Sequence, residues 1–262
     1  METASATPAP PVIEMSGVVV GSAPDLDRAV LEGVNWTVRA GEYWVLAGMH
    51  ASGKNDLISL LSGLTPPLEG VYRLFGRQMS LYGDELAAER LRLGTVFEHG
   101  QLLQQLTIKE NVALPLRYHR NVPWQEIEQR VGAMLESTEL LPYADAMPGR
   151  LPRHWQKRAG LARALMLEPE VLLVDKPLAG LDPRQAAWWL NFLGQWFAGR
   201  GSPRDRRVTL VVTAEDLRPW RHAPCHFALL KEKQFLVLGH RPNFDEQQDS
   251  LVGELLAPER PG

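Results

Sequence analysis

The chain has 262 residues, of which 45% are hydrophobic and 23% charged, a balance typical of a large globular domain with a sizeable core. Its formal net charge of -3 argues against a nucleic-acid partner. The single cysteine, Cys225, excludes a disulfide framework and is expected to be a buried structural thiol. No stretch approaches the roughly 18 consecutive apolar residues that a membrane span needs. Residues 1–11 lack the pattern of a signal peptide and are interpreted as a disordered leader.

Strand patterns and turns alternate in the first third of the chain. We expect strands at residues 12–20, 29–38, 43–47, 71–75 and 93–97. The strand at 43–47 leads into a glycine-containing loop, and an apolar helix follows at 55–61. This order places the loop between a strand and a helix.

Helical periodicity dominates the middle of the chain, from residue 107 to about 141 and again from 152 to 167. A later helix carries an aromatic stripe that is interpreted as core or interface packing, namely Trp188, Trp189, Phe192, Trp196 and Phe197. Further strands are expected at 171–174, 208–213, 225–230 and 234–238, with a short helix near 251–255. Strands that alternate with helices predict an α/β fold with a mostly parallel sheet and a helical region at about 98–165.

A phosphate-loop motif occupies the loop after the strand at 43–47. The spacing Gly-x-x-x-x-Gly-Lys is typical of backbone amides that cradle phosphate, with a lysine that reaches the outer phosphates. The candidate nucleotide-binding residues are Gly48, Ser52, Gly53, Lys54 and Asn55. Asn55 stands where serine or threonine would offer Mg²⁺ a hydroxyl, so the loop could survive only as a sharp turn.

A second motif follows the apolar strand at 171–174. Asp175 ends this strand and is the candidate ligand of a phosphate-bound Mg²⁺. The next residue, where a nucleotide hydrolase places the carboxylate that holds the attacking water, is Lys176. An ammonium donates hydrogen bonds and accepts none, so Lys176 cannot act as that base. It is expected to pair with Glu98 or Asp175.

The order of these motifs resembles the ATP-binding cassette of ABC transporters over residues 12 to about 240. The resemblance rests on the phosphate loop, Val96-Phe97-Glu98, the segment 106–116, the segment 158–165, the strand at 171–174 and Val211-Val212-Thr213. The segments 106–116 and 158–165 look most like the ATPase of lipid-asymmetry (Mla/Mce-type) importers. The resemblance implies a P-loop NTPase fold with a parallel core sheet, N-terminal antiparallel strands and a helical subdomain at about 98–165. It leaves 241–262 as a C-terminal tail.

Most of the family's functional positions are altered in this chain. The family's metal- and water-linking glutamine falls on Glu98, its catalytic glutamate on Lys176 and its switch histidine on Ala214. The signature Leu-Ser-Gly-Gly-Gln falls on Leu151, Pro152, Arg153, His154 and Trp155. Asp175 is kept, and no aromatic residue stands between Gly17 and Ala29 to stack an adenine. The resemblance therefore implies ATP as a candidate ligand and a weakened Mg²⁺ site.

The altered positions favour a cassette-fold pseudoATPase that acts as a scaffold or transporter subunit. A permease is the expected partner, with a second cassette as another, at the inner face of the membrane. In the family, two cassettes pair head to tail, and each site combines the phosphate loop of one subunit with the signature of the other. Because both parts are altered in this chain, a homodimer would contain no intact site. Two alternatives stay open. One is a working transporter ATPase, for lipids or small molecules, in which Glu215 or Asp216 serves as the base. The other is a small-molecule kinase of the phosphate-loop class.

Overall fold

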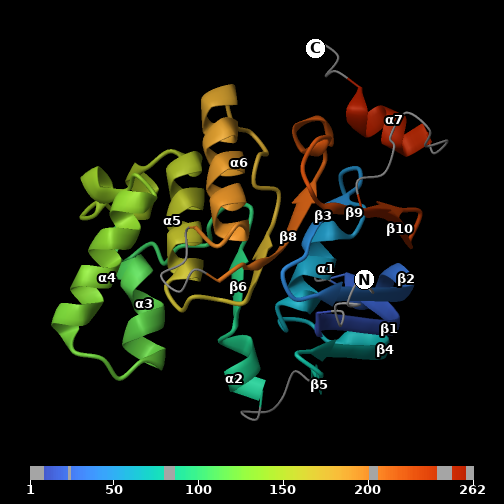
Figure 1. Ribbon diagram of the computed structural model, residues 1–262, viewed down its shortest axis with the longest axis horizontal. Helices are drawn as coiled ribbons and strands as arrows, with labels where there is room; N and C mark the ends of the chain where they lie inside the picture. Colours follow the sequence, from blue (N-terminus) through green and yellow to red (C-terminus); the bar gives the residue numbers. More distant parts are fainter. Residues whose placement is uncertain (1–8, 23–24, 80–85, 201–205, 241–249, 258–262) are drawn as a thin grey trace, which may run out of the picture.

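Two β-sheets organise the computed structural model, which describes residues 9–22, 25–79, 86–200, 206–240 and 250–257 (Figure 1). The first sheet is antiparallel in the order β2-β1-β4-β5 and comprises β1 (Pro11–Ser22), β2 (Asp25–Arg39), β4 (Pro67–Leu74) and β5 (Arg77–Gln78). The second sheet has the order β10-β9-β3-β8-β7-β6. Its strands are β3 (Tyr43–Ala47), β6 (Leu93–Val96), β7 (Val171–Val174), β8 (Thr209–Ala214), β9 (His226–Lys231) and β10 (Gln234–His240).

The six-stranded sheet is parallel except at one edge, where β10 runs antiparallel to β9. The predicted parallel core sheet and N-terminal antiparallel strands are therefore confirmed. In a parallel sheet the carboxyl ends of neighbouring strands lie at the same edge. The segments that follow β3, β7 and β8 are consequently brought together although they lie far apart in the sequence.

Seven α-helices are present in the described part of the chain. They are α1 (Lys54–Leu61), α2 (Ala87–Arg90), α3 (Ile108–His119), α4 (Trp124–Ser137), α5 (Arg153–Leu165), α6 (Pro183–Phe197) and α7 (Ser250–Leu256). Short 3-10 turns occur at Leu141–Tyr143, Pro148–Arg150 and Arg218–Trp220. The helical region predicted from 107 to 141 is split in two, because residues 120–123 are not helical and Pro123 caps α4.

The two faces of the parallel sheet bury different side chains, as expected for the alternating geometry of strands. Along β3, Tyr43, Val45 and Ala47 pack with α5, α6 and α7, whereas Trp44 and Leu46 pack with α1 and the antiparallel sheet. The helix α1 is thus enclosed between two sheets. This enclosure fixes the loop that precedes it.

A third apolar cluster joins α3, α4 and α5 into the helical region, which lies on the far side of the molecule from the antiparallel sheet (Figure 1). Thr107 and Glu110 form a capping box that starts α3. The buried amide of Asn111 donates to the carbonyl oxygens of Leu103, Leu106 and Thr107, which orders the segment after β6.

The predicted roles of the aromatic stripe and the cysteine are confirmed. Trp189, Phe192 and Trp196 are buried in the core, and Cys225 is a buried thiol that forms no disulfide. The short helix expected near 251–255 is α7. Residues 1–8 of the predicted leader and residues 241–249 and 258–262 of the predicted tail lie outside the described residues. Within the described part, no helix has the length and apolar character needed to cross a bilayer.

Candidate functional site

The phosphate-loop residues lie where β3 ends and α1 begins. A Cβ added to Gly48 would lie 2.5 Å from Ser52 Oγ and 2.7 Å from the carbonyl oxygen of Leu230, so the position has no room for a side chain. Gly53 has φ = 88° and occupies the N-cap of α1, a left-handed conformation that glycine adopts without strain. The backbone N–H of Gly48 donates to the carbonyl of Ala214 and ties the loop to β8. The loop keeps its two glycines for geometric reasons.

Lys54 points back into its own loop. Its ammonium donates to the carbonyl oxygens of Gly48 and Met49, at 2.7 Å each, and to Ser52 Oγ at 3.1 Å. The residue is only 2% exposed, and burial lowers its pKa to about 8. Asn55, which replaces the hydroxyl residue, is exposed on the first turn of α1.

Asp175 and Lys176 follow β7, next to the end of β8. Thr213 Oγ1 donates to Asp175 Oδ1 at 2.6 Å and accepts from the backbone N–H of Lys176 at 2.8 Å. Burial raises the pKa of Asp175, although the Thr213 hydrogen bond and the Lys176 charge oppose the rise. Lys176 has φ = 42°, which turns the chain sharply after the strand.

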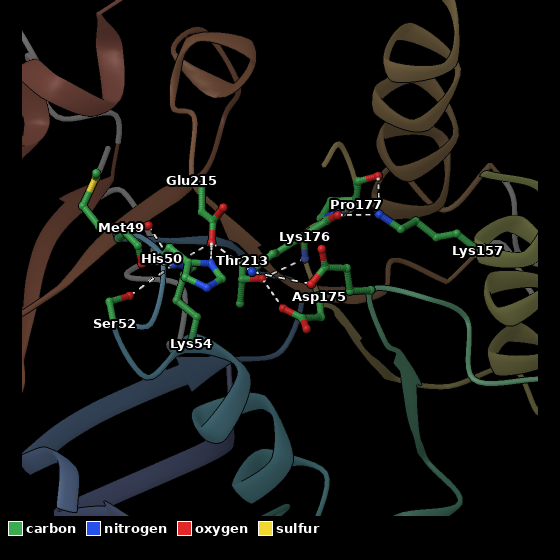
Figure 2. Close-up of polar contacts among 12 residues, drawn as sticks. Met49, His50, Ser52, Lys54, Lys157, Asp175, Lys176, Pro177, Thr213 and Glu215 are labelled. Carbon is green, nitrogen blue, oxygen red and sulfur yellow. Dashed lines mark hydrogen bonds and ion pairs between the residues drawn. The ribbon is translucent and has the colours of Figure 1, made fainter. Parts of the chain in front are cut away.

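The ammonium of Lys176 forms ion pairs with two carboxylates, and Figure 2 shows the pair with Glu215. It is 2.9 Å from Glu215 Oε1 and 3.5 Å from Glu98 Oε2, and the residue is 6% exposed. The predicted pair with Glu98 is present. The alternative with Asp175 was wrong, because the ion pairs of Lys176 in the described structure go to Glu98 and Glu215.

Glu215 is the centre of a wider ion-pair cluster. The same Oε1 lies 3.5 Å from the ammonium of Lys54 and 3.8 Å from Nδ1 of His50 (Figure 2). Burial would raise the pKa of Glu215, but the lysines outweigh it and the pKa falls below the ordinary value. A carboxylate held in its ionised form by two ammonium groups is a poor general base. The other candidate base, Asp216, is paired with Arg218.

Lys157 is a further site residue that the sequence did not single out. It lies on α5, is 4% exposed, and donates to the carbonyl oxygen of Lys176 at 2.7 Å. Burial lowers its pKa to about 8. A third buried ammonium therefore supports the turn that presents Lys176.

The signature segment caps and opens α5. The helix predicted from residue 152 begins one residue later, at Arg153, and Pro152 is its N-cap residue. Trp155 packs on Tyr143 and Arg158, with ring contacts of 4.8 Å and 4.6 Å. Leu151 contacts the same apolar cluster. Arg153 and His154 line a cavity of about 160 Å³ with Glu98, Lys157 and the segment 179–181.

The position of the family's switch histidine holds a methyl group. Ala214 is 5% exposed at the end of β8, and its carbonyl accepts from the phosphate loop. The structure thus brings the phosphate loop, Asp175, Lys176, Glu98 and the end of β8 to one edge of the sheet. It places the signature segment apart from the phosphate loop, beside Glu98.

The fold and these motifs match known proteins. The family model described as ABC transporter matches residues 31–179, which is more than half of the chain. The chain belongs to the ABC transporter family. Its structure is similar to the dimeric, post-hydrolysis state of the ATP-binding cassette MJ0796 bound to ADP and Pi. The TM-score is 0.75 at 26% identity, over 85% of this chain and 95% of that one.

The curated relatives of this ABC family member are named for amino-acid import. Methionine import ATP-binding protein MetN 2 of Paraburkholderia xenovorans is 35% identical over 85% of this chain and 56% of its own length. MetN of Geobacillus kaustophilus is 38% identical over 66% of this chain and 49% of its own length. The chain thus spans about half the length of these relatives. These relatives are named for methionine import and do not confirm the lipid-asymmetry subfamily predicted from the sequence.

Proposed function

We propose that this chain is an ATP-binding-cassette subunit of a membrane transporter that does not hydrolyse ATP. The observation that carries the proposal is the ion pair of Lys176 with Glu215, 2.9 Å long, at the position where the family places its catalytic carboxylate. An ammonium in that position cannot accept a proton from water. The carboxylate nearest to it is held in its ionised form.

The expected loss of rate is large. Removing a general base costs about 10²–10⁴-fold. Removing a donor that stabilises developing charge costs about 10²–10³-fold by analogy. Both kinds of loss are present, at Lys176 and Ala214 and in the signature segment, and they fall within a single chain. Even without full additivity, turnover should be negligible.

Nucleotide phosphates fit the site better than Mg²⁺ does. The loop from Gly48 to Lys54 has the backbone geometry of an anion cradle at a helix N-terminus. The metal position, in contrast, has an exposed amide at Asn55 and a buried ammonium within 3.5 Å of Glu98. A cation 4 Å from that ammonium would meet a repulsion of about 4 kcal/mol per unit charge at an effective dielectric constant near 20. We therefore propose ATP as the ligand and no resident Mg²⁺.

A permease is the proposed partner. An apolar cleft of about 320 Å³ opens between β6, α3 and α5, and its lining includes Leu103, Leu114, Pro115 and Tyr118. Tyr118 is 78% exposed and Leu103 is 43% exposed, so the cleft presents both side chains to solvent. An amphipathic helix of a transmembrane subunit fits such a cleft. This cleft supports a peripheral place at the inner face of the membrane. A second cassette is a further proposed partner, because the similar cassette MJ0796 is dimeric.

The transported substrate is a separate matter. The relatives named above import methionine, while the segments 106–116 and 158–165 predicted a lipid-type importer. A lipid-type substrate stays a prediction from those segments alone. The proposal of a non-hydrolysing subunit holds for either substrate class.

Steady-state ATP hydrolysis tests the proposal. The wild-type chain with MgCl₂ should release no more phosphate than Lys54→Ala, which removes the phosphate-loop ammonium and reports contaminating activity. Turnover clearly above that control would favour the alternative, a working transporter ATPase such as the relatives' names describe. That alternative also requires Lys176→Glu to leave the rate unchanged or lower it.

A further inference from the structure

An anion, the carboxylate of Glu215, already lies beside the phosphate loop and pairs with the Lys54 ammonium. One oxygen, Oε1, lies 2.9 Å from the Lys176 ammonium, 3.5 Å from the Lys54 ammonium and 3.8 Å from Nδ1 of His50. Three basic groups from two segments of the chain converge on this atom. His50 and Lys54 belong to the phosphate loop before and at the start of α1, and Lys176 follows β7 (Figure 2).

The two lysine side chains of the cluster are buried, whereas the glutamate is partly exposed. The lysine side chains are 1% and 7% exposed, whereas Glu215 is 37% exposed and comes from the open end of β8. Further hydrogen bonds fix both lysines. The ammonium of Lys54 donates to carbonyl oxygens of its own loop, and Lys157 donates to the carbonyl oxygen of Lys176. The carboxylate is therefore the part of the cluster that can leave while the ammonium groups stay in place.

A phosphate offers the same chemistry as this carboxylate, with more charge and more acceptor oxygens. It can replace Glu215 on Lys54 and Lys176 without any other ion. The cluster contains three ammonium groups and three carboxylates, so its charges are already balanced. The ammonium groups are those of Lys54, Lys157 and Lys176, and the carboxylates are those of Glu98, Asp175 and Glu215. A site of this composition has no excess of carboxylates that would attract a divalent cation.

We propose that the site binds the phosphates of ATP without a divalent cation, by exchange with Glu215, and that Lys176 supplies the positive charge. This inference rests on the proposed nucleotide-binding cassette and assigns two specificity-determining residues to it. Glu215 acts as an internal competitor that limits affinity. Lys176 serves in place of the metal.

Calorimetric titration of the full chain with ATP tests the proposal, in MgCl₂ and in EDTA. Wild type should bind at least as tightly in EDTA as in MgCl₂. Glu215→Gln keeps the side-chain shape and removes the competing charge, so affinity should rise about tenfold in both buffers. Lys176→Met should lower affinity about tenfold. The matched control is Glu32→Gln, which neutralises a surface pair with Lys233 of 2.8 Å and should change nothing.

Three results would overturn the inference. They are a tenfold or larger requirement for Mg²⁺, unchanged or weaker binding in Glu215→Gln, and no binding by a wild-type chain that is folded by circular dichroism. Should Glu215→Gln fail to fold, Glu215→Asp tests the same point, because a shorter carboxylate competes less and should also tighten binding. Phosphate release is measured in the same samples. Hydrolysis by wild type would refute the proposed non-hydrolysing role, whereas a Mg²⁺ requirement without hydrolysis refutes metal-free binding and leaves that role intact.

Discussion

The ion pair between Lys176 and Glu215 should contribute measurably to stability. The perturbation is a double-mutant cycle of Lys176→Met and Glu215→Gln, which removes each charge while keeping side-chain length. Breaking the pair one partner at a time leaves the other charge without its main counterion. The coupling energy from the cycle isolates the interaction from the separate cost of each substitution.

The distance and burial of the pair set the expected coupling energy. At 2.9 Å and an effective dielectric constant near 20, two unit charges attract by about 6 kcal/mol, most of which desolvation offsets. Lys176 is buried, but Glu215 is 37% exposed, so solvent screens part of the attraction. Glu98 also remains as a second partner of Lys176. We expect a coupling energy of about 1–3 kcal/mol.

Urea denaturation at pH 7 measures the coupling, with the surface pair of Lys233 and Glu32 as the matched control. That pair has nearly the same length, 2.8 Å, but its side chains are 56% and 55% exposed. A cycle of Lys233→Met and Glu32→Gln should give about 0.2–1 kcal/mol. A coupling at Lys176 and Glu215 no larger than that of the surface pair would refute the burial argument.

Three further outcomes are expected. Gly48→Ala forces a methyl group against Ser52 and Leu230 and should lower the free energy of unfolding by about 1–3 kcal/mol, measured in urea; an unchanged midpoint would contradict the steric argument. Arg158→Met should lower the free energy of unfolding by about 2–4 kcal/mol in the same assay, because the buried guanidinium donates to Glu139 and Gln185 and stacks on Trp188. A loss smaller than that of an average surface substitution would refute this role of Arg158. The third outcome concerns pH. Burial lowers the pKa of Lys54 and Lys157 to about 8, so between about pH 8 and 10 the unfolded chain binds more protons, and stability should rise by at most about 1.4 kcal/mol per pH unit for each lysine. Urea midpoints at several pH values should show a smaller slope for Lys157→Met, and an equal slope would contradict the assignment.

The phosphate loop and the core sheet could be predicted because their signals are local. Gly48 and Gly53 have a fixed spacing, and β3, β7 and β8 are short apolar runs. The aromatic stripe of α6 follows helical periodicity, so the burial of Trp189 was also predictable. The elements β5 and α2 have only two and four residues, too few for any period to be recognised.

The partners of Lys176 depend on strand order, which local patterns do not contain. Glu215 is 39 residues from Lys176 in the chain and reaches it because β8 pairs directly with β7. From the sequence, Glu98 and Asp175 were the predicted partners of Lys176, and Glu215 was predicted only as a substitute base. Lys157 was missed for a related reason. It lies on a helix whose inward face becomes visible only once α5 is packed on the sheet.

Single-turnover phosphate release most directly tests the claim that this cassette has lost its hydrolytic chemistry. The chain would be held in excess over ATP labelled at the γ-phosphate, with MgCl₂, so that slow product release cannot hide a chemical step. The account predicts that wild type releases labelled phosphate no faster than Lys54→Ala. Faster release by wild type, abolished by Lys54→Ala, would contradict it.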